Sequence, residues 1–137
     1  MRLRSSRQAE RVEEAATTFS SALVDADHRQ RRRQLEQALA EVDRAADALR
    51  RRPGDRTLFE YRRAVRRFLE LALAGTYTVE RHLRMEVRGG RRLTAIVRQV
   101  DEQLDRLATE VLARQRDLLA IAARLADIRG LLLDLLR

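Results

Sequence analysis

The chain has 137 residues and a mass of 15.9 kDa, a length typical of one domain. Its 29 arginines, 22 leucines, 20 alanines and 11 glutamates are about 60% of the residues, a composition typical of long helices and coiled coils. The few glycines and prolines almost exclude an all-β sandwich, and the lack of cysteine excludes disulfides, thiolate zinc sites and a cysteine nucleophile.

The formal net charge of +8 lies within residues 1–92, because acidic and basic residues balance in residues 93–137. The chain has no run of 18 apolar residues and no apolar stretch after Met1, so we expect neither a membrane span nor a signal peptide. These features predict a cytoplasmic protein that does not associate with membranes.

Residues 1–34 contain the first predicted helix, which we expect to be an N-terminal element that is mobile relative to the rest. Its apolar residues follow a helical spacing: Val12, Ala16, Phe19, Leu23 and Ala26. Residues 27–34 contain no apolar side chain, and a second stripe starts out of phase: Leu35, Leu39, Val42, Ala46 and Leu49. The change of phase predicts a bend or a short connection, with a helical domain over residues 35–137.

Pro53-Gly54 is a strong helix stop. The next predicted helix carries the stripe Leu58, Tyr61, Val65, Phe68 and Ala72. Residues 76–92 then combine β-branched residues with Gly89-Gly90. We expect this segment to be the main non-helical stretch, as a loop or a short hairpin.

Apolar residues recur at alternating spacings of four and three from Leu93 to Leu135, and only Arg114 interrupts them. One helix over this stretch would be about 65 Å long, whereas a compact domain of this size is about 28 Å across. The helix must therefore break, bend or project. The sequence predicts an all-α fold, an elongated bundle of four to five helices with a long C-terminal helix or helix pair.

The C-terminal segment is apolar on nearly all sides, which is typical of a helix that is buried in a core or between chains. Its predicted seam consists of Leu118, Ile121, Leu125, Ile128 and Leu132. A buried core of one chain and a self-association surface are both consistent with this pattern. We expect the protein to be a homodimer, with an unknown protein partner.

Arg62, Arg63, Arg66 and Arg67 share one helix face, about 150° from the apolar stripe of the same helix. Several guanidinium groups on one face can neutralise adjacent phosphates, although an ordinary solvated face has the same pattern. The runs at residues 31–33 and 50–52 contain no interleaved aromatic residue, which argues against a base-stacking platform there. Nucleic-acid binding would therefore lack sequence specificity.

Catalytic and metal-binding patterns are weak. Asp25, Asp27 and His28 would be a poor metal site because ligands must converge from several elements. Gly89-Gly90 lacks the pattern of a phosphate-binding loop, which favours a plain turn. We expect no enzymatic activity, no metal and no cofactor.

Three stretches resemble the YaaR-like family: residues 58–69 (LFEYRRAVRRFL), 96–104 (IVRQVDEQL, after GGRR at 89–92) and 128–134 (IRGLLLD). The last stretch is the most specific, and Leu136 stands where the family has tyrosine. The resemblance covers residues 35–137 and implies a bacterial, cytoplasmic, helical protein of unknown biochemical role, without catalytic or binding residues to transfer.

We therefore expect a non-enzymatic cytoplasmic interaction or scaffold protein that self-associates. The alternative is an arginine-rich protein that binds nucleic acid without sequence preference.

Overall fold

The computed structural model describes the backbone of residues 2–83 and 87–137, and the side chains of residues 6–74 and 90–137. In this part of the chain it has four helices and no strand: α1 (Arg2–Arg51), α2 (Asp55–Leu83), α3 (Val87–Leu112) and α4 (Leu118–Leu136). The predicted all-α class is confirmed. The chain forms two compact units, Met1–Arg33 and Gln34–Arg137.

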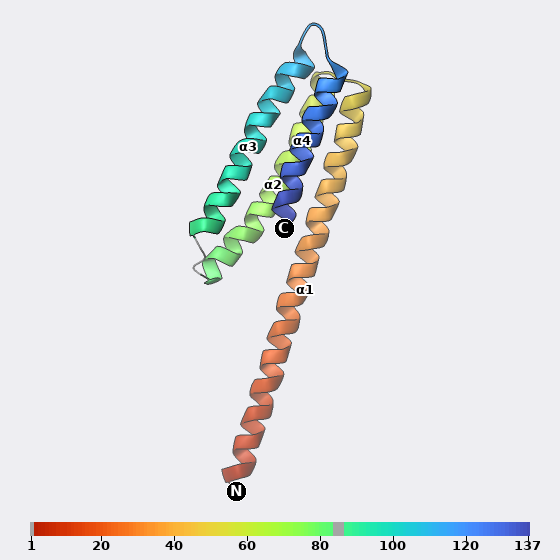
Figure 1. The fold of residues 1–137 in the computed structure, drawn as a ribbon. Coiled ribbons are helices and arrows are strands. Elements are labelled where there is room, and N and C mark those ends of the chain that lie inside the picture. The colour runs from red at the N-terminus through yellow and green to blue at the C-terminus, as the bar shows by residue number, and fades with distance from the viewer. Residues whose placement is uncertain (1, 84–86) are drawn as a thin grey trace. The chain divides into compact units, whose positions relative to one another are not determined.

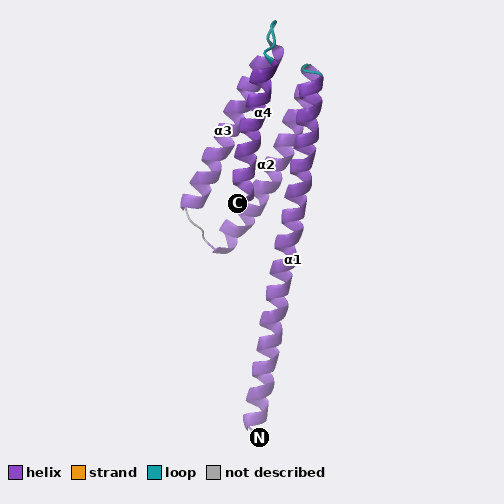
Figure 2. Ribbon diagram, turned by 45° about the vertical axis from the view of Figure 1, so that its right-hand side comes forward, coloured by secondary structure: helices purple, strands orange, loops and turns teal. Residues whose placement is uncertain are grey.

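The second unit is an up-and-down bundle of the last part of α1 with α2, α3 and α4 (Figure 1). Successive helices run in opposite directions because short loops join them. The loops at residues 52–54 and 113–117 lie at the same end of this bundle, where both are coloured teal in Figure 2.

Each of the four helices contributes one apolar stripe to the core of the bundle. The most deeply buried side chains, below 2% exposed, are Val42, Leu49, Tyr61, Val65, Phe68, Val100, Leu107, Val111, Ile121, Ile128 and Leu132. These are the stripe positions that the sequence predicts after residue 34. The described part of the chain has no buried polar or charged residue except Tyr61, whose phenol lies in this core. Burial, together with the nearby charge of Asp43, raises the pKa of Tyr61.

Pro53 and Gly54 separate α1 from α2, as predicted. Backbone hydrogen bonds close both sides of the turn: the Arg52 amide donates to the Ala48 carbonyl at 2.9 Å, and the Leu58 amide donates to the Gly54 carbonyl at 3.0 Å. The turn therefore satisfies backbone groups that the helix ends would leave unpaired.

The apolar pattern after Leu93 forms two helices, because α3 ends at Leu112 and α4 begins at Leu118. Arg114, which interrupts the pattern, is exposed in the loop between them. Asp117 caps α4: its Oδ1 accepts hydrogen bonds from the amides of Leu119 (3.0 Å) and Ala120 (3.1 Å). The expected helix pair is confirmed, and the break lies where the stripe turns polar.

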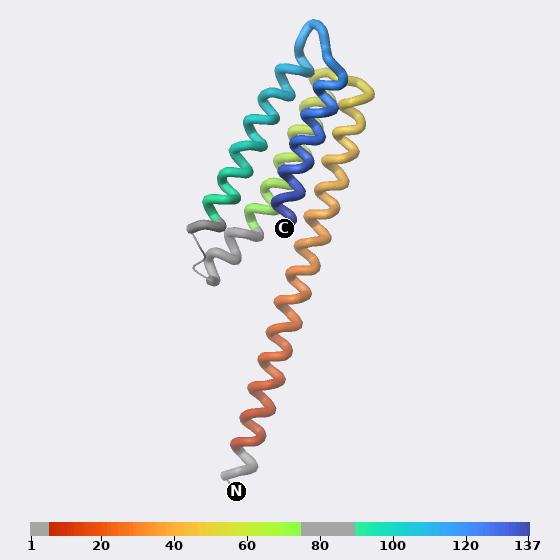
Figure 3. Tube along the Cα trace, in the orientation of Figure 1, coloured from red at the N-terminus to blue at the C-terminus, as the bar shows by residue number. Residues whose placement is uncertain are grey.

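Two expectations about local structure are wrong. No short connection between two helices occurs at residues 27–34, because α1 is helical from Arg2 to Arg51. Residues 76–83 and 87–92 are helical parts of α2 and α3, whereas residues 84–86 lie outside the described part (Figure 3). Arginine and glutamine are good helix formers, and β-branched residues reduce helix stability only slightly, so neither segment has to leave the helix.

Candidate anion-binding face

The side of α2 that faces away from the core is set by its apolar stripe. Leu58, Tyr61, Val65 and Phe68 are at most 5% exposed. Since side chains advance by about 100° per residue, positions three and four residues apart on the other side of α2 share a solvent-facing surface. The helix therefore holds its outward side chains on a rigid, well-packed element.

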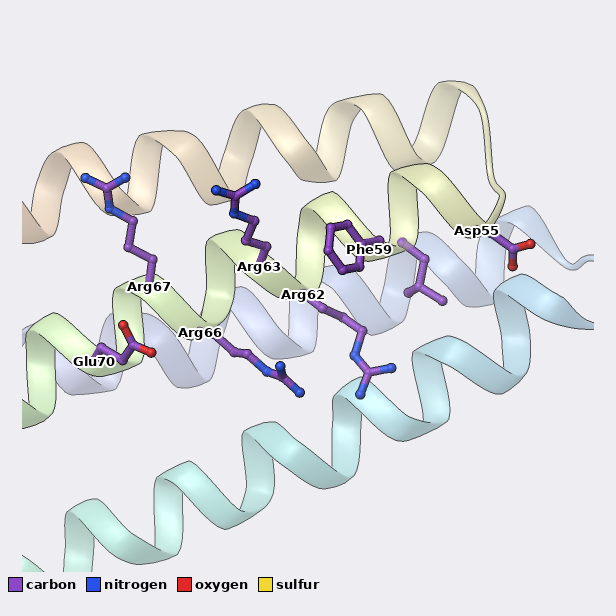
Figure 4. A pocket seen from close by; sticks show the side chains of 8 residues that line it. Asp55, Phe59, Arg62, Arg63, Arg66, Arg67 and Glu70 are labelled. Atoms are coloured by element: carbon purple, nitrogen blue, oxygen red, sulfur yellow. The ribbon is translucent and has the colours of Figure 1, made fainter.

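This outward surface carries Arg62, Arg63, Arg66 and Arg67, which we call the basic face. Arg62 and Arg66 extend toward α3, whereas Arg63 and Arg67 extend away from it (Figure 4). Arg62 is half-buried and the other three are exposed. The guanidinium groups thus form two rows, each with about 6 Å of helical rise between its two members.

The basic face lacks internal neutralisation. Within the described side chains, none of the four arginines makes a hydrogen bond or an ion pair. The other arginines with ion pairs illustrate the contrast, because Arg124 contacts Glu110 at 2.8 Å and Arg129 contacts Asp43 at 3.0 Å. The charge of the basic face is therefore available to an external anion.

Phe59 lies between the two arginine rows and is 63% exposed. On an ideal helix its direction is within about 10° of the mean direction of the four arginines. Residues of α2 alone line a shallow depression of about 600 Å³ at this place: Asp55, Leu58, Phe59, Arg62, Arg63, Arg66, Arg67 and Glu70. The surface is open, and an aromatic ring lies on it, between Asp55 and the arginines along α2 (Figure 4).

Sequence analysis did not identify Phe59 as a functional residue. The signal was present, because Phe59 lies off the stripe that contains Leu58 and Tyr61 and shares the direction of the basic face. Acidic residues mark both ends of the surface, Asp55 near the start of α2 and Glu70 after Arg67. An anion would therefore be attracted most strongly to the middle of the surface.

The predicted seam is divided by the structure. Ile121, Leu125, Ile128 and Leu132 are at most 4% exposed within a single chain, so they belong to the core of the bundle. Leu118 is 59% exposed, because it is the first residue of α4 and follows the loop. The structure thus does not bring Leu118 together with the other four.

Arg124 joins α4 to α3. It donates to Glu110 Oε1 from both Nε (3.2 Å) and Nη2 (2.8 Å), and its Nη1 donates to Gln103 at 2.6 Å. The hydrogen bond with Glu110 raises the pKa of Arg124. Gln103 and Glu110 on α3 are both partners of Arg124 on α4, so this cluster is explained as a structural link between the helices.

The arginine runs at residues 31–33 and 50–52 differ from the basic face in that some of their members have partners. Arg31 and Arg32 have interaction partners, and Arg50 pairs with Asp47 one turn earlier on α1. Arg50 and Arg51 also lie in the last turn of α1, where positive charge is favoured by the helix dipole.

The unit Met1–Arg33 exposes large apolar side chains. Val12, Phe19, Leu23 and Val24 are each between 52% and 69% exposed. Asp25, Asp27 and His28 lie on the same helix, and the described residues include no group of three or more acidic or histidine side chains that could hold a metal ion. In the described part of the chain, no helix combines the length and apolar character that a membrane span requires.

Comparisons place the chain among proteins without an assigned biochemical role. The model of a family described as "Protein of unknown function (DUF327)" matches residues 1–136. The match includes the N-terminal helix, which the sequence motifs had left out. The chain is also similar to the "Uncharacterized protein YaaR" of Bacillus subtilis, with 20% identity over 91% of this chain and 86% of that protein.

Similar folds occur in solved structures. The uncharacterized protein BH1478 from Bacillus halodurans matches 86% of this chain and 97% of its own, with a TM-score of 0.76 and 22% identity. Protein TM1646 from Thermotoga maritima, also a DUF327 match, has a TM-score of 0.70 and 29% identity over 85% of this chain and 96% of its own. A designed granulopoietic protein, Moevan, has a TM-score of 0.72 and 23% identity over 79% of this chain and 92% of its own.

Proposed function

We propose that this chain, which belongs to the DUF327 family of proteins of unknown function, is a non-enzymatic interaction protein. On this proposal it binds the phosphate backbone of nucleic acid on the basic face. The observation that carries the proposal is the set of four guanidinium groups on one helix face, with no hydrogen bond or ion pair to any described residue.

The chemistry of the face suits phosphate groups. Guanidinium groups bind phosphate oxygens with paired hydrogen bonds, and two rows of two can contact successive phosphates of one strand. Such contacts position a nucleic acid but read no base edges. The proposed binding is therefore independent of sequence, and its affinity depends steeply on salt concentration.

The test is fluorescence anisotropy with a labelled duplex of random sequence at salt concentrations from 50 to 200 mM. Four phosphate contacts predict a slope of about −3.6 for the logarithm of affinity against the logarithm of salt concentration, which is about a 150-fold loss over this range. The variant Arg63→Glu/Arg67→Glu should abolish binding.

The matched control is Arg98→Glu/Arg106→Glu, which changes two exposed arginines of α3 and alters the net charge by the same amount. The control should retain most of the affinity. Equal losses in both variants, or no binding of wild-type protein at 50 mM salt, would refute the proposal.

A second candidate function is self-association as a scaffold, and one observation favours it: the exposed apolar side chains of Val12, Phe19 and Leu23, which share one face of the helix in the first unit. Burying such side chains contributes about 1.5–3 kcal/mol each, so two copies of this helix gain free energy by covering them. Sedimentation should then show a dimer that Phe19→Asp/Leu23→Asp dissociates. The control Thr17→Asp/Ser21→Asp, with the same spacing on the other side of the helix, should remain dimeric.

A further inference from the structure

The exposed ring of Phe59 is the feature of the basic face that phosphate binding alone does not use. Its side chain is 63% exposed although Leu58 beside it in sequence is 5% exposed. The ring lies in the depression between the Arg62/Arg66 row and the Arg63/Arg67 row. An aromatic surface flanked by guanidinium groups on two sides has the chemistry that single-stranded nucleic acid recognises.

We infer that the preferred ligand of the basic face is single-stranded nucleic acid, with one base stacked on Phe59 and the neighbouring phosphates bound by the two arginine rows. This inference rests on the proposed function and adds the class of nucleic acid. In a duplex the bases are stacked on one another and their faces are covered, so an aromatic ring on a helix surface contacts none of them. A single strand can turn a base onto the ring while its phosphates reach the arginines.

The spacing of the groups supports this arrangement. Phe59 precedes Arg62 and Arg63 by three and four residues, so these three side chains are neighbours on the helix surface. The two members of each row are separated by about 6 Å of helical rise, so each row presents two guanidinium groups along a short stretch of strand. Acidic residues follow at the ends, Asp55 before Phe59 and Glu70 after Arg67, so the favourable stretch accommodates only a short segment of the strand.

The decisive variant is Phe59→Ala, measured with a 12-nucleotide oligothymidine and with a duplex of equal length. The ring makes little contact with the core, so the thermal unfolding of the variant should match that of wild type. Loss of one stacked base predicts about a 5- to 150-fold lower affinity for the single strand. The affinity for the duplex should change less than 2-fold, and Phe59→Trp should restore single-strand binding.

Phe59→Trp also provides a direct readout, because the chain contains no other tryptophan. Stacking of a base should quench its fluorescence when oligothymidine is added, whereas an oligonucleotide of abasic sites with the same phosphates should bind without quenching. Phe19→Trp is a matched control, since Phe19 is 66% exposed and lies in the first unit. Its fluorescence should not change.

The two levels of the proposal fail in different ways. If neither single strand nor duplex binds, nucleic-acid binding itself is refuted. If both bind equally and Phe59→Ala leaves both affinities unchanged, the stacking inference is overturned, whereas phosphate binding by the arginines stands. Equal quenching by the abasic and the complete oligonucleotide would also overturn the inference, because no base would then be needed.

Discussion

Substituting Leu132 and Leu118 separately by alanine tests whether the folded bundle of one chain accounts for the apolar seam of α4. Leu132 is 0% exposed and Leu118 is 59% exposed. A leucine-to-alanine change at a fully buried site costs about 2–5 kcal/mol, because the transfer free energy is lost and a cavity remains. At Leu118 less than half of the side chain is covered, so the cost should stay below about 1 kcal/mol.

Urea unfolding followed by circular dichroism measures both variants against wild type. With a denaturant dependence of about 2 kcal/mol/M, Leu132→Ala should lower the midpoint by about 1–2.5 M and Leu118→Ala by less than about 0.5 M. A cost at Leu118 equal to that at Leu132 would refute this reasoning, since a second chain would then have to cover Leu118. In that case the midpoint of wild-type protein would also depend on protein concentration.

The remaining predictions concern the start of α4 and the end of the basic face. Asp117→Ala removes two capping hydrogen bonds and should destabilise the bundle by about 1 kcal/mol, measured by urea unfolding. Asp117→Asn keeps a capping oxygen and should destabilise the bundle less. Equal losses of stability in the two variants would contradict the capping role. Glu70→Gln removes a negative charge beside the arginines and should raise duplex affinity about 2- to 5-fold in the anisotropy assay. Glu102→Gln, an equal charge change at an exposed site of α3, should raise the affinity less, and equal effects would attribute the gain to net charge.

The core of the bundle follows from the sequence because burial imposes a period. From Leu35 onward, each helix must turn apolar residues toward the same interior, so spacings of three and four identify Val42, Tyr61, Val100 and Ile128 as core residues, and all are at most 1% exposed. The interruption at Arg114 also predicts the end of a helix, because an arginine at a stripe position indicates where the chain leaves the core.

The errors occurred where no core imposes a period. The polar stretch at residues 27–34 favours a connection between two helices by sequence, yet arginine and glutamine maintain a helix without apolar contacts, and α1 is helical there. Gly89 and Gly90 favour a turn by sequence, although they lie within the first turn of α3. At the end of a helix the low helix propensity of glycine reduces stability only slightly. A change in apolar phase therefore does not require a break in the helix.

The candidate site was predicted in part. The four arginines follow from helical periodicity, since positions opposite a buried stripe face the solvent. Their lack of ion pairs could not be predicted, because it depends on which carboxylates the neighbouring helices bring near. Spacing alone assigns Leu118 to the seam, but α4 begins at that residue. The apolar spacing therefore continues one position beyond the residues that the core buries.

The two sides of α2 have different roles in the proposed function. Leu58, Tyr61 and Phe68 hold the helix in the core, whereas Phe59 and the basic face project into solvent and contribute little to that packing. Substitutions on the outward side can therefore change affinity without unfolding the bundle. If the net charge of +8 alone attracted nucleic acid, charge reversal on α3 and on α2 would weaken binding equally. A larger loss on α2 than on α3 would place the bound anion at α2, and this outcome distinguishes a local site from an effect of net charge.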